Sequence, residues 1–157
     1  MKVLFVCTGN ICRSPTAEGV FLHRAAERGL AGRVAADSAG TSSEEHGNPP
    51  DPRARRAADA RGYALPDRRA RRIAGTDFDE FDLILAMDRG HLARLERIAP
   101  DHARERLRLF MDYAGDGMPK DVPDPWYGGA ADFEHALDLI EAGVDGLLDA
   151  LTADAGR

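Results

Sequence analysis

A cysteine and an arginine six positions apart could together handle a phosphoryl group. They lie in the segment Cys7-Thr8-Gly9-Asn10-Ile11-Cys12-Arg13-Ser14, which follows a short apolar run and precedes a helical pattern. In an α/β fold, the turn from a strand into the next helix points backbone amides and the positive end of the helix dipole at one spot. The position of this segment therefore predicts a site for an anion of phosphate size.

The side chains of this segment suggest distinct roles. Arg13 carries a planar, permanently charged fork that can hold two phosphate oxygens. The same positive field favours the thiolate form of Cys7, which would then be a nucleophile at neutral pH. Ser14 can donate a hydrogen bond from its hydroxyl to that sulfur and ease its departure from an intermediate, or it can cap the helix, and the two roles are compatible.

The backbone of the segment is expected to form the cradle itself. Gly9 can adopt a positive φ angle and Asn10 tolerates one, so the successive amides between Thr8 and Arg13, including that of Ile11, could converge on one anion. The sequence leaves two roles open for Cys12. Its side chain packs under the loop, or it forms a reversible disulfide that protects an oxidised nucleophile.

A proton donor for the leaving group is expected in the loop of residues 115–129, which holds three prolines and four glycines. Asp124 is the preferred donor because prolines on both sides restrict its backbone, and Asp121 is the second candidate. Trp126 and Tyr127 either form aromatic walls for a flat substrate or anchor the loop to the core.

The elements that position these residues follow an α/β pattern. Residues 3–6 and 83–86 are unbroken apolar runs typical of buried parallel strands, and residues 34–36 and 107–110 are weaker strand candidates. Helices are expected over residues 14–29, 52–61, 88–98 and 133–151. We therefore predict an α/β fold of about four strands in one domain, the size that 157 residues allow.

Composition excludes several classes of protein. The formal charge of −6 makes nucleic acid and anionic membranes improbable partners, and no apolar run is long enough for a signal peptide or a membrane span. We expect a monomer in the cytoplasm. The two cysteines rule out a disulfide scaffold, and the five histidines lack the spacing of a metal site and are expected to be ordinary surface residues.

Charge is unevenly distributed along the chain. Residues 51–72 hold eight arginines and three aspartates, a net charge of +5, whereas residues 112–157 have a net charge of −9. Two readings of the arginine cluster stay open: a solvated helix face, or a surface that steers an anionic substrate.

Taken together, these motifs resemble the low molecular weight protein tyrosine phosphatases. The resemblance covers nearly the whole chain and also includes the segments 37–41, 50–53 and 87–88. It implies a doubly wound sheet of four parallel strands, formed by residues 1–157 as a single phosphatase domain. It also implies that Cys7 forms a cysteinyl-phosphate, that Arg13 binds phosphate and that Asp124 acts as acid and then base. The implied substrate is phosphotyrosine in proteins, the product is inorganic phosphate, and neither a metal nor an organic cofactor is implied.

By the same resemblance, the Ser38 side chain would hold Asn10 in a strained conformation. The chain departs from the family at three places. The tryptophan common after the Ser-Ala-Gly-Thr segment is replaced by Glu44 or its neighbours, and Trp126 stands where tyrosine is common. A common histidine is replaced by Arg68, which is expected to take over its supporting role against Asp88.

Other activities fit these residues less well. Thioredoxin-coupled arsenate reductases need further cysteines, and none follows Cys12. Protein-arginine phosphatases resemble this loop with a threonine where Ile11 stands, so Ile11 favours an aryl substrate. A non-catalytic phosphoprotein-binding or thiol redox-sensing module is the other alternative, and the presence of Asp124 argues against it.

Overall fold

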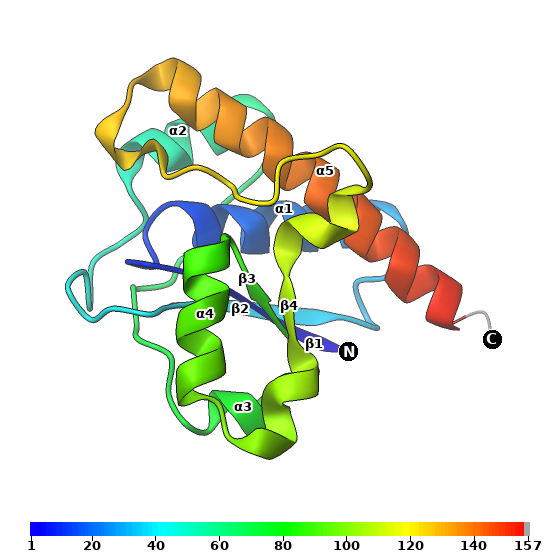
Figure 1. Cartoon of the computed structure of the whole chain (residues 1–157). Coiled ribbons are helices and arrows are strands. Elements are labelled where there is room, and N and C mark those ends of the chain that lie inside the picture. Colours follow the sequence, from blue (N-terminus) through cyan, green and yellow to red (C-terminus); the bar gives the residue numbers. More distant parts are fainter. Residues whose placement is uncertain (156–157) are drawn as a thin grey trace.

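Four parallel strands form the centre of the computed structural model, which describes residues 1–155 (Figure 1). Their order across the sheet is β2-β1-β3-β4, and every neighbouring pair is parallel. The strands are β1 (Lys2–Cys7), β2 (Ala35–Gly40), β3 (Leu83–Ala86) and β4 (Leu107–Leu109). The predicted four-stranded parallel sheet is thus confirmed, whereas the expected domain end at residue 157 lies outside the described residues.

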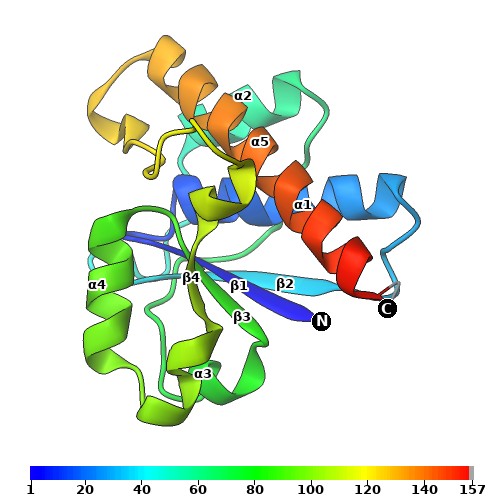
Figure 2. The same ribbon diagram turned by 45° about the vertical axis from the view of Figure 1, so that its right-hand side comes forward.

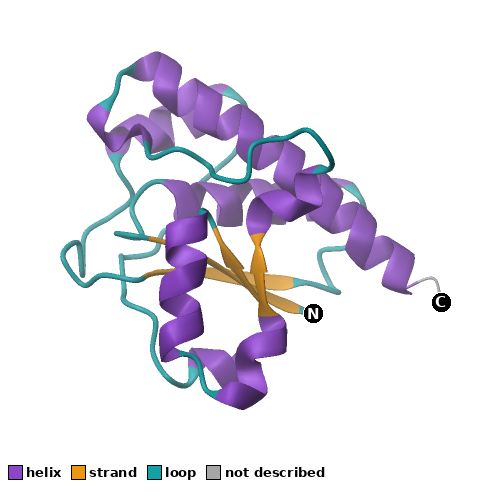
Figure 3. Ribbon diagram, viewed as in Figure 1, coloured by secondary structure: helices purple, strands orange, loops and turns teal. Residues whose placement is uncertain are grey.

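Helices connect the strands and account for most of the remaining ordered structure (Figure 3). The α-helices are α1 (Arg13–Glu27), α2 (Pro52–Ala60), α3 (Asp77–Glu80), α4 (Arg89–Ile98) and α5 (Ala130–Ala155). Short 3-10 helices are η1 (Asp101–Arg106), η2 (Phe110–Ala114) and η3 (Pro125–Tyr127). The sequence prediction missed α3 and the 3-10 helices and made the last helix too short. No helix within residues 1–155 is both long and apolar enough to cross a bilayer.

The sheet is covered by helices on both faces (Figure 2). Val3, Phe5 and Cys7 of β1 belong to the buried cluster that packs against α1 and α5. Leu4 and Val6 point the other way, into the cluster beside α4. Because side chains of a strand alternate between faces, an apolar run such as that of β1 is what a strand buried on both sides requires.

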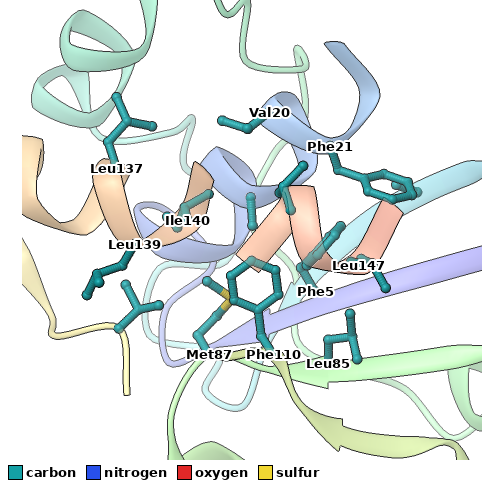
Figure 4. Packing of buried hydrophobic residues seen from close by; sticks show 14 of the residues in the cluster. Phe5, Val20, Phe21, Leu85, Met87, Phe110, Leu137, Leu139, Ile140 and Leu147 are labelled. Carbon is teal, nitrogen blue, oxygen red and sulfur yellow. The ribbon is translucent and has the colours of Figure 1, made fainter. Parts of the chain in front are cut away.

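Aromatic and aliphatic side chains pack together in the larger of these clusters (Figure 4). The Phe5 ring meets Phe21 of α1 and Phe110 of η2 edge to face, with ring centroids 5.6 Å and 5.8 Å apart. Ile140 and Leu147 of α5 are buried in the same cluster. The strand that ends at Cys7 is therefore anchored by packing to both the first and the last helix.

Charged side chains add a second connection between α5 and the helices beside it, here called the α5 ion-pair network. Arg24 of α1 bonds to Tyr63 and Glu141, and Arg61 at the end of α2 pairs with Glu134 and Glu141. The remaining members are Arg28, Asp138, Asp145 and Asp149. Arg61, a member of the arginine cluster of residues 51–72, thus pairs with acidic residues of α5. Neither interpretation of that cluster, as a solvated helix face or as a surface that steers an anionic substrate, predicted this pairing.

The second strand differs most from its prediction. β2 begins at Ala35 and runs on to Gly40, well past residue 36, where the sequence prediction ended. It is an edge strand and contains polar residues, which weakened its sequence signal. A Cβ atom on Gly40 would lie 2.5 Å from the Thr8 carbonyl oxygen, so a glycine there lets β2 end directly against the loop that follows β1.

Candidate active site

Residues 7–14, here called the cysteine loop, connect the central strand to the first helix. β1 ends at Cys7 and α1 begins at Arg13, with Cys12 at its N-cap position. Among the described residues, none accepts a hydrogen bond from the backbone amides of residues 9–12. Free amides at the N-terminus of a helix create a positive concavity, as the sequence predicted.

The conformation of this loop depends on Asn10. Its φ angle is 59°, and it is the sole non-glycine residue with positive φ in residues 1–155. Its side-chain amide donates to the hydroxyls of Ser14 and Ser38, each at 2.9 Å, and its carbonyl oxygen accepts from the Arg71 amide at 3.0 Å. The expected contact with Ser38 is therefore present, and Arg71 adds a third bond that the sequence did not reveal.

The positive φ angle expected at Gly9 was wrong, because Gly9 is not among the residues with positive φ. Space is the constraint at this position: a Cβ atom on Gly9 would lie 3.2 Å from the Glu45 Cγ atom. Glu45 and Glu44 come from the loop after β2, where the family commonly has tryptophan. This acidic segment therefore packs against the cysteine loop.

Cys7 and Ser14 face one another beneath the loop. The Cys7 side chain is buried, and its Sγ atom lies 3.0 Å from Ser14 Oγ. Ser14 Oγ accepts a hydrogen bond from the Asn10 amide, so its own proton can go to the sulfur at 3.0 Å or to the Ala39 carbonyl oxygen at 3.4 Å, and the sulfur is the nearer acceptor. Ser14 does not cap α1: it lies inside the first turn, and no side chain caps this helix.

Arg13 is almost completely buried, with 5% of its side chain exposed. One terminal nitrogen, Nη1, donates to Asp88 Oδ2 and to the Val122 carbonyl oxygen, both at 2.9 Å. The other, Nη2, lies 3.7 Å from Asp124 Oδ2. The guanidinium is thus fixed from behind by α4 and the 115–129 loop, and it lines the cleft described below.

Arg68 does not support Asp88, so that expectation was wrong. Its Nε atom donates to Glu18 Oε2 at 2.6 Å and lies 3.4 Å from Asp37 Oδ1. Burial raises the pKa of Glu18, and the Arg68 charge opposes this rise. A buried carboxylate on α1 thus attracts Arg68 away from the site, and the partners of Asp88 are Arg13 and His91.

His91, near the start of α4, is the residue of the site that sequence reasoning missed. Four of the five histidines are exposed as expected, but His91 is buried. Its Nε2 atom lies 2.8 Å from Thr8 Oγ1 and 3.5 Å from Arg13 Nη2, and its Nδ1 atom lies 3.1 Å from Asp88 Oδ1. The available signal was its spacing of four from Leu95, which is buried on the same helix.

The burial of His91 predicts a pH dependence of stability. Burial lowers the pKa of His91 to about 4, assisted by Arg13 and opposed by Asp88. Between pH 6.5 and 4 the unfolded chain binds this proton and the folded chain does not, so stability falls as pH falls. Urea unfolding at pH 7 and pH 5 should show that wild type loses about 1–2 kcal/mol more than His91→Gln. Equal losses in the two proteins would contradict the prediction.

A cleft of about 150 Å³ opens above the cysteine loop. Its lining includes nine of the predicted site residues and two that were not predicted, namely Cys7, Thr8, Gly9, Ile11, Cys12, Arg13, Asp124, Trp126 and Tyr127, with Glu44 and Glu45. The rings of Trp126 and Tyr127 stack edge to face at 4.8 Å, and their exposed fractions of 44% and 86% show that they do not anchor the core.

The two candidate acids occupy different environments. Asp124 lines the cleft, and its Oδ1 atom accepts from the Trp126 amide at 3.1 Å. Asp121 pairs with Arg89 at 3.0 Å, and this hydrogen bond holds the pKa of Asp121 below its ordinary value. The cleft lining does not include Asp121. The geometry therefore favours Asp124 as the group that meets a bound molecule.

Cys12 packs beside Ala54 and Phe133 at the base of the cleft. Burial raises the pKa of this thiol, as does the nearby charge of Asp51. Both cysteines are free thiols, and the reversible disulfide between them on oxidation stays a prediction. Within residues 1–155, no three His, Cys, Asp or Glu side chains are grouped as metal ligands would be.

Fold and site together define a class of α/β proteins in which a cysteine-arginine loop follows the first strand of a parallel sheet. Residues 2–156 match the family model for low molecular weight phosphotyrosine protein phosphatase, and the chain belongs to this family. A low molecular weight protein-tyrosine-phosphatase of Streptomyces coelicolor is 47% identical over 153 residues, which cover 96% of this chain and 93% of that protein.

Solved structures agree with this assignment. A protein tyrosine phosphatase of Entamoeba histolytica with Hepes in its active site superposes with a TM-score of 0.95 at 35% identity, covering 99% of both chains. A Drosophila arginine phosphatase superposes with a TM-score of 0.90 at 32% identity, covering 96% of this chain and 98% of that one. The fold is therefore shared by proteins described as tyrosine phosphatases and by one described as an arginine phosphatase.

Proposed function

We propose that the protein hydrolyses phosphotyrosine in proteins, and aryl phosphates generally, through a cysteinyl-phosphate. The observation that carries this proposal is the arrangement at the floor of the cleft. There the Cys7 sulfur, the free amides of residues 9–12 and the Arg13 guanidinium are all contributed by one loop. A thiol within an anion-binding concavity is suited to attack a phosphorus atom whose oxygens the concavity holds.

In the first step, the Cys7 thiolate attacks phosphorus, a P–S bond forms and the ester P–O bond breaks. The loop amides and Arg13 hold the phosphoryl oxygens as charge redistributes over them. Asp124, at the edge of the same cleft, gives its proton to the departing phenolate oxygen. The loop conformation that this step needs is stabilised beforehand by Asn10, so the amides require little rearrangement.

In the second step, water attacks the phosphorus of the cysteinyl-phosphate and Asp124 takes up a proton from it. The P–S bond breaks and inorganic phosphate leaves. The Ser14 hydroxyl, 3.0 Å from Sγ, donates a hydrogen bond to the sulfur as it regains negative charge. All groups in this scheme are side chains or amides of the chain, and the proposal includes no metal or organic cofactor.

The walls of the cleft favour an aromatic substrate over phosphoarginine. Ile11, Trp126 and Tyr127 present apolar and aromatic surface where the phosphorylated side chain would lie. Phosphoarginine would place a polar guanidino group against Ile11. The accompanying proposals are a monomeric protein in the cytoplasm that takes phosphoproteins as partners and binds neither nucleic acid nor membranes.

A substrate panel tests the proposal. Purified protein should hydrolyse para-nitrophenyl phosphate at an unchanged rate with and without EDTA. Among peptides of one sequence, phosphotyrosine should be hydrolysed at least about tenfold faster than phosphoserine or phosphoarginine, since apolar surface contributes roughly 1.5–3 kcal/mol per buried ring. Preference for phosphoarginine would favour the arginine phosphatase, and binding of phosphopeptides without turnover would favour the non-catalytic module.

Asp124 should be distinguishable from Asp121 by substitution. Asp124→Asn should lower kcat for phenyl phosphate by about 100-fold or more, because a poor leaving group needs the proton. The loss for para-nitrophenyl phosphate should be smaller, since its leaving group needs less assistance. Asp121→Asn is the matched control, and kcat should change less than about threefold. A larger loss in Asp121→Asn than in Asp124→Asn would reverse the assignment.

A further inference from the structure

His91 lies against the catalytic groups but outside the cleft in which the substrate would bind. It borders a second, open groove on the other side of Thr8, lined also by Arg72 and Arg94. We propose that His91 is a positioning residue, whose uncharged imidazole holds the Arg13 guanidinium and the Thr8 hydroxyl in the arrangement that binds phosphate. This inference rests on the proposed function of Arg13 as phosphate ligand.

The contacts of the imidazole favour one tautomer. Nδ1 lies 3.1 Å from Asp88 Oδ1, an atom that can only accept, and the negative charge there favours a proton on Nδ1. Nε2 is then the acceptor. It faces two donors, the Thr8 hydroxyl at 2.8 Å and Arg13 Nη2 at 3.5 Å. A single tautomer of His91 therefore suits all three neighbours.

One side of the Arg13 guanidinium is bonded to protein groups, and the other side can bind a phosphate. Nη1 donates both of its protons, to Asp88 Oδ2 and to the Val122 carbonyl oxygen. Nε and Nη2 make up the other side, the fork that would face a phosphate. His91 Nε2 lies beside Nη2, and so it fixes the rotation of that fork without competing for charge.

The uncharged state of His91 matters because of its surroundings. The charged groups that act on it are Asp88, Arg13, Asp124 and Asp121. An imidazolium here would present a proton from Nε2 to Arg13 Nη2, itself a donor, and would repel the guanidinium. Burial keeps the pKa of His91 at about 4, so the acceptor persists at any pH near neutrality. The Nδ1 atom has no well-aligned hydrogen-bond partner, so the Asp88 contact is mainly electrostatic.

Two variants separate positioning from space filling. His91→Phe keeps a flat ring of similar shape and removes both nitrogens, whereas His91→Gln loses the ring but can keep an acceptor near the position of Nε2. The matched control is His102→Phe, since His102 is exposed and its partner is Asp79, remote from the site. Each protein is assayed for kcat and KM with para-nitrophenyl phosphate. Inorganic phosphate binding is measured without turnover, by protection of Cys7 against iodoacetamide.

We expect kcat for His91→Phe to fall roughly tenfold, with half-protection of Cys7 requiring about fivefold more phosphate, as for loss of a hydrogen bond to a charged group. His91→Gln should stay within about threefold of wild type in both measurements. A wild-type-like His91→Phe together with an impaired His91→Gln would assign His91 to packing alone and overturn the proposal. Failure of wild type itself to hydrolyse any aryl phosphate would instead overturn the proposed function, and the protection assay would still report on Arg13.

Discussion

Replacing Cys7 with serine should lower kcat for para-nitrophenyl phosphate by about 10⁴-fold or more, the scale of effect seen when a nucleophile is removed. Serine has nearly the same shape as cysteine, so the packing beneath the loop should persist. Its hydroxyl holds its proton far more tightly than a thiol does, and residues 1–155 place no base within hydrogen-bond distance of this side chain. The partner at this position is the Ser14 hydroxyl, which is itself a hydrogen-bond donor.

The same variant should still bind inorganic phosphate, because the amides of residues 9–12 and Arg13 are unchanged. Isothermal titration calorimetry should give a dissociation constant for Cys7→Ser within about tenfold of wild type. Thermal unfolding of both proteins checks that the fold is intact. A serine variant that retains more than about one per cent of wild-type kcat would show that another group attacks phosphorus.

Replacing Arg13 with lysine should lower kcat by about 10³-fold, the loss expected when a preorganised donor to the transition state is removed. Lysine keeps the positive charge but loses the planar fork. It also cannot bond to Asp88 and Val122 while presenting two further donors to a phosphate, as Arg13 does. Phosphate affinity should fall less than kcat, because charge spreads onto the phosphoryl oxygens most fully in the transition state.

Arg97→Lys is the matched control for this substitution. Arg97 lies on α4, the helix whose N-cap residue Asp88 bonds to Arg13, but its side chain is exposed. Steady-state kinetics should show no change for Arg97→Lys beyond about twofold. If Arg13→Lys kept kcat and raised KM alone, Arg13 would contribute only to binding in the ground state.

The sequence predicted correctly those strands and helices whose buried residues form a regular apolar pattern. The apolar runs of β1 and β3 predicted central parallel strands, and the apolar spacing in α5 predicted a long helix packed on one face. It was less accurate for β2, whose Asp37 and Ser38 do not alternate clearly with apolar residues. Strand formation there comes from pairing with β1, a tertiary effect that local composition does not encode.

The sequence predicted the residues that would react with or bind a phosphate, but not most of the contacts that hold those residues in place. Spacing linked Cys7 to Arg13, the flanking prolines in a long loop indicated Asp124, and all three line one cleft. The assignment of their catalytic roles stays a prediction until the variants are measured, and so does the single domain over residues 1–157. Positive φ was expected at Gly9 and allowed at Asn10; it occurs at Asn10 and not at Gly9, because the hydroxyls of Ser14 and Ser38 stabilise it there.

Supporting contacts that join distant segments escaped prediction for a physical reason. Arg68 is attracted by the buried Glu18, fifty positions away, and His91 meets Thr8 across 83 positions. Such pairs depend on how helices cross the sheet, which one sequence does not specify. The burial of His91 was the part that helical spacing could have suggested.

The α5 ion-pair network also has a consequence for how the protein responds to heat. Removing charged groups from water becomes less unfavourable as temperature rises, whereas the contribution of buried apolar surface reaches a plateau. The bonds of Arg24 and Arg61 to Glu141 should therefore supply a growing share of what keeps α5 attached to α1 and α2 on warming. A relative from a thermophile could therefore gain thermal stability by adding ion pairs to the α5 ion-pair network, without changes to the residues of the cleft.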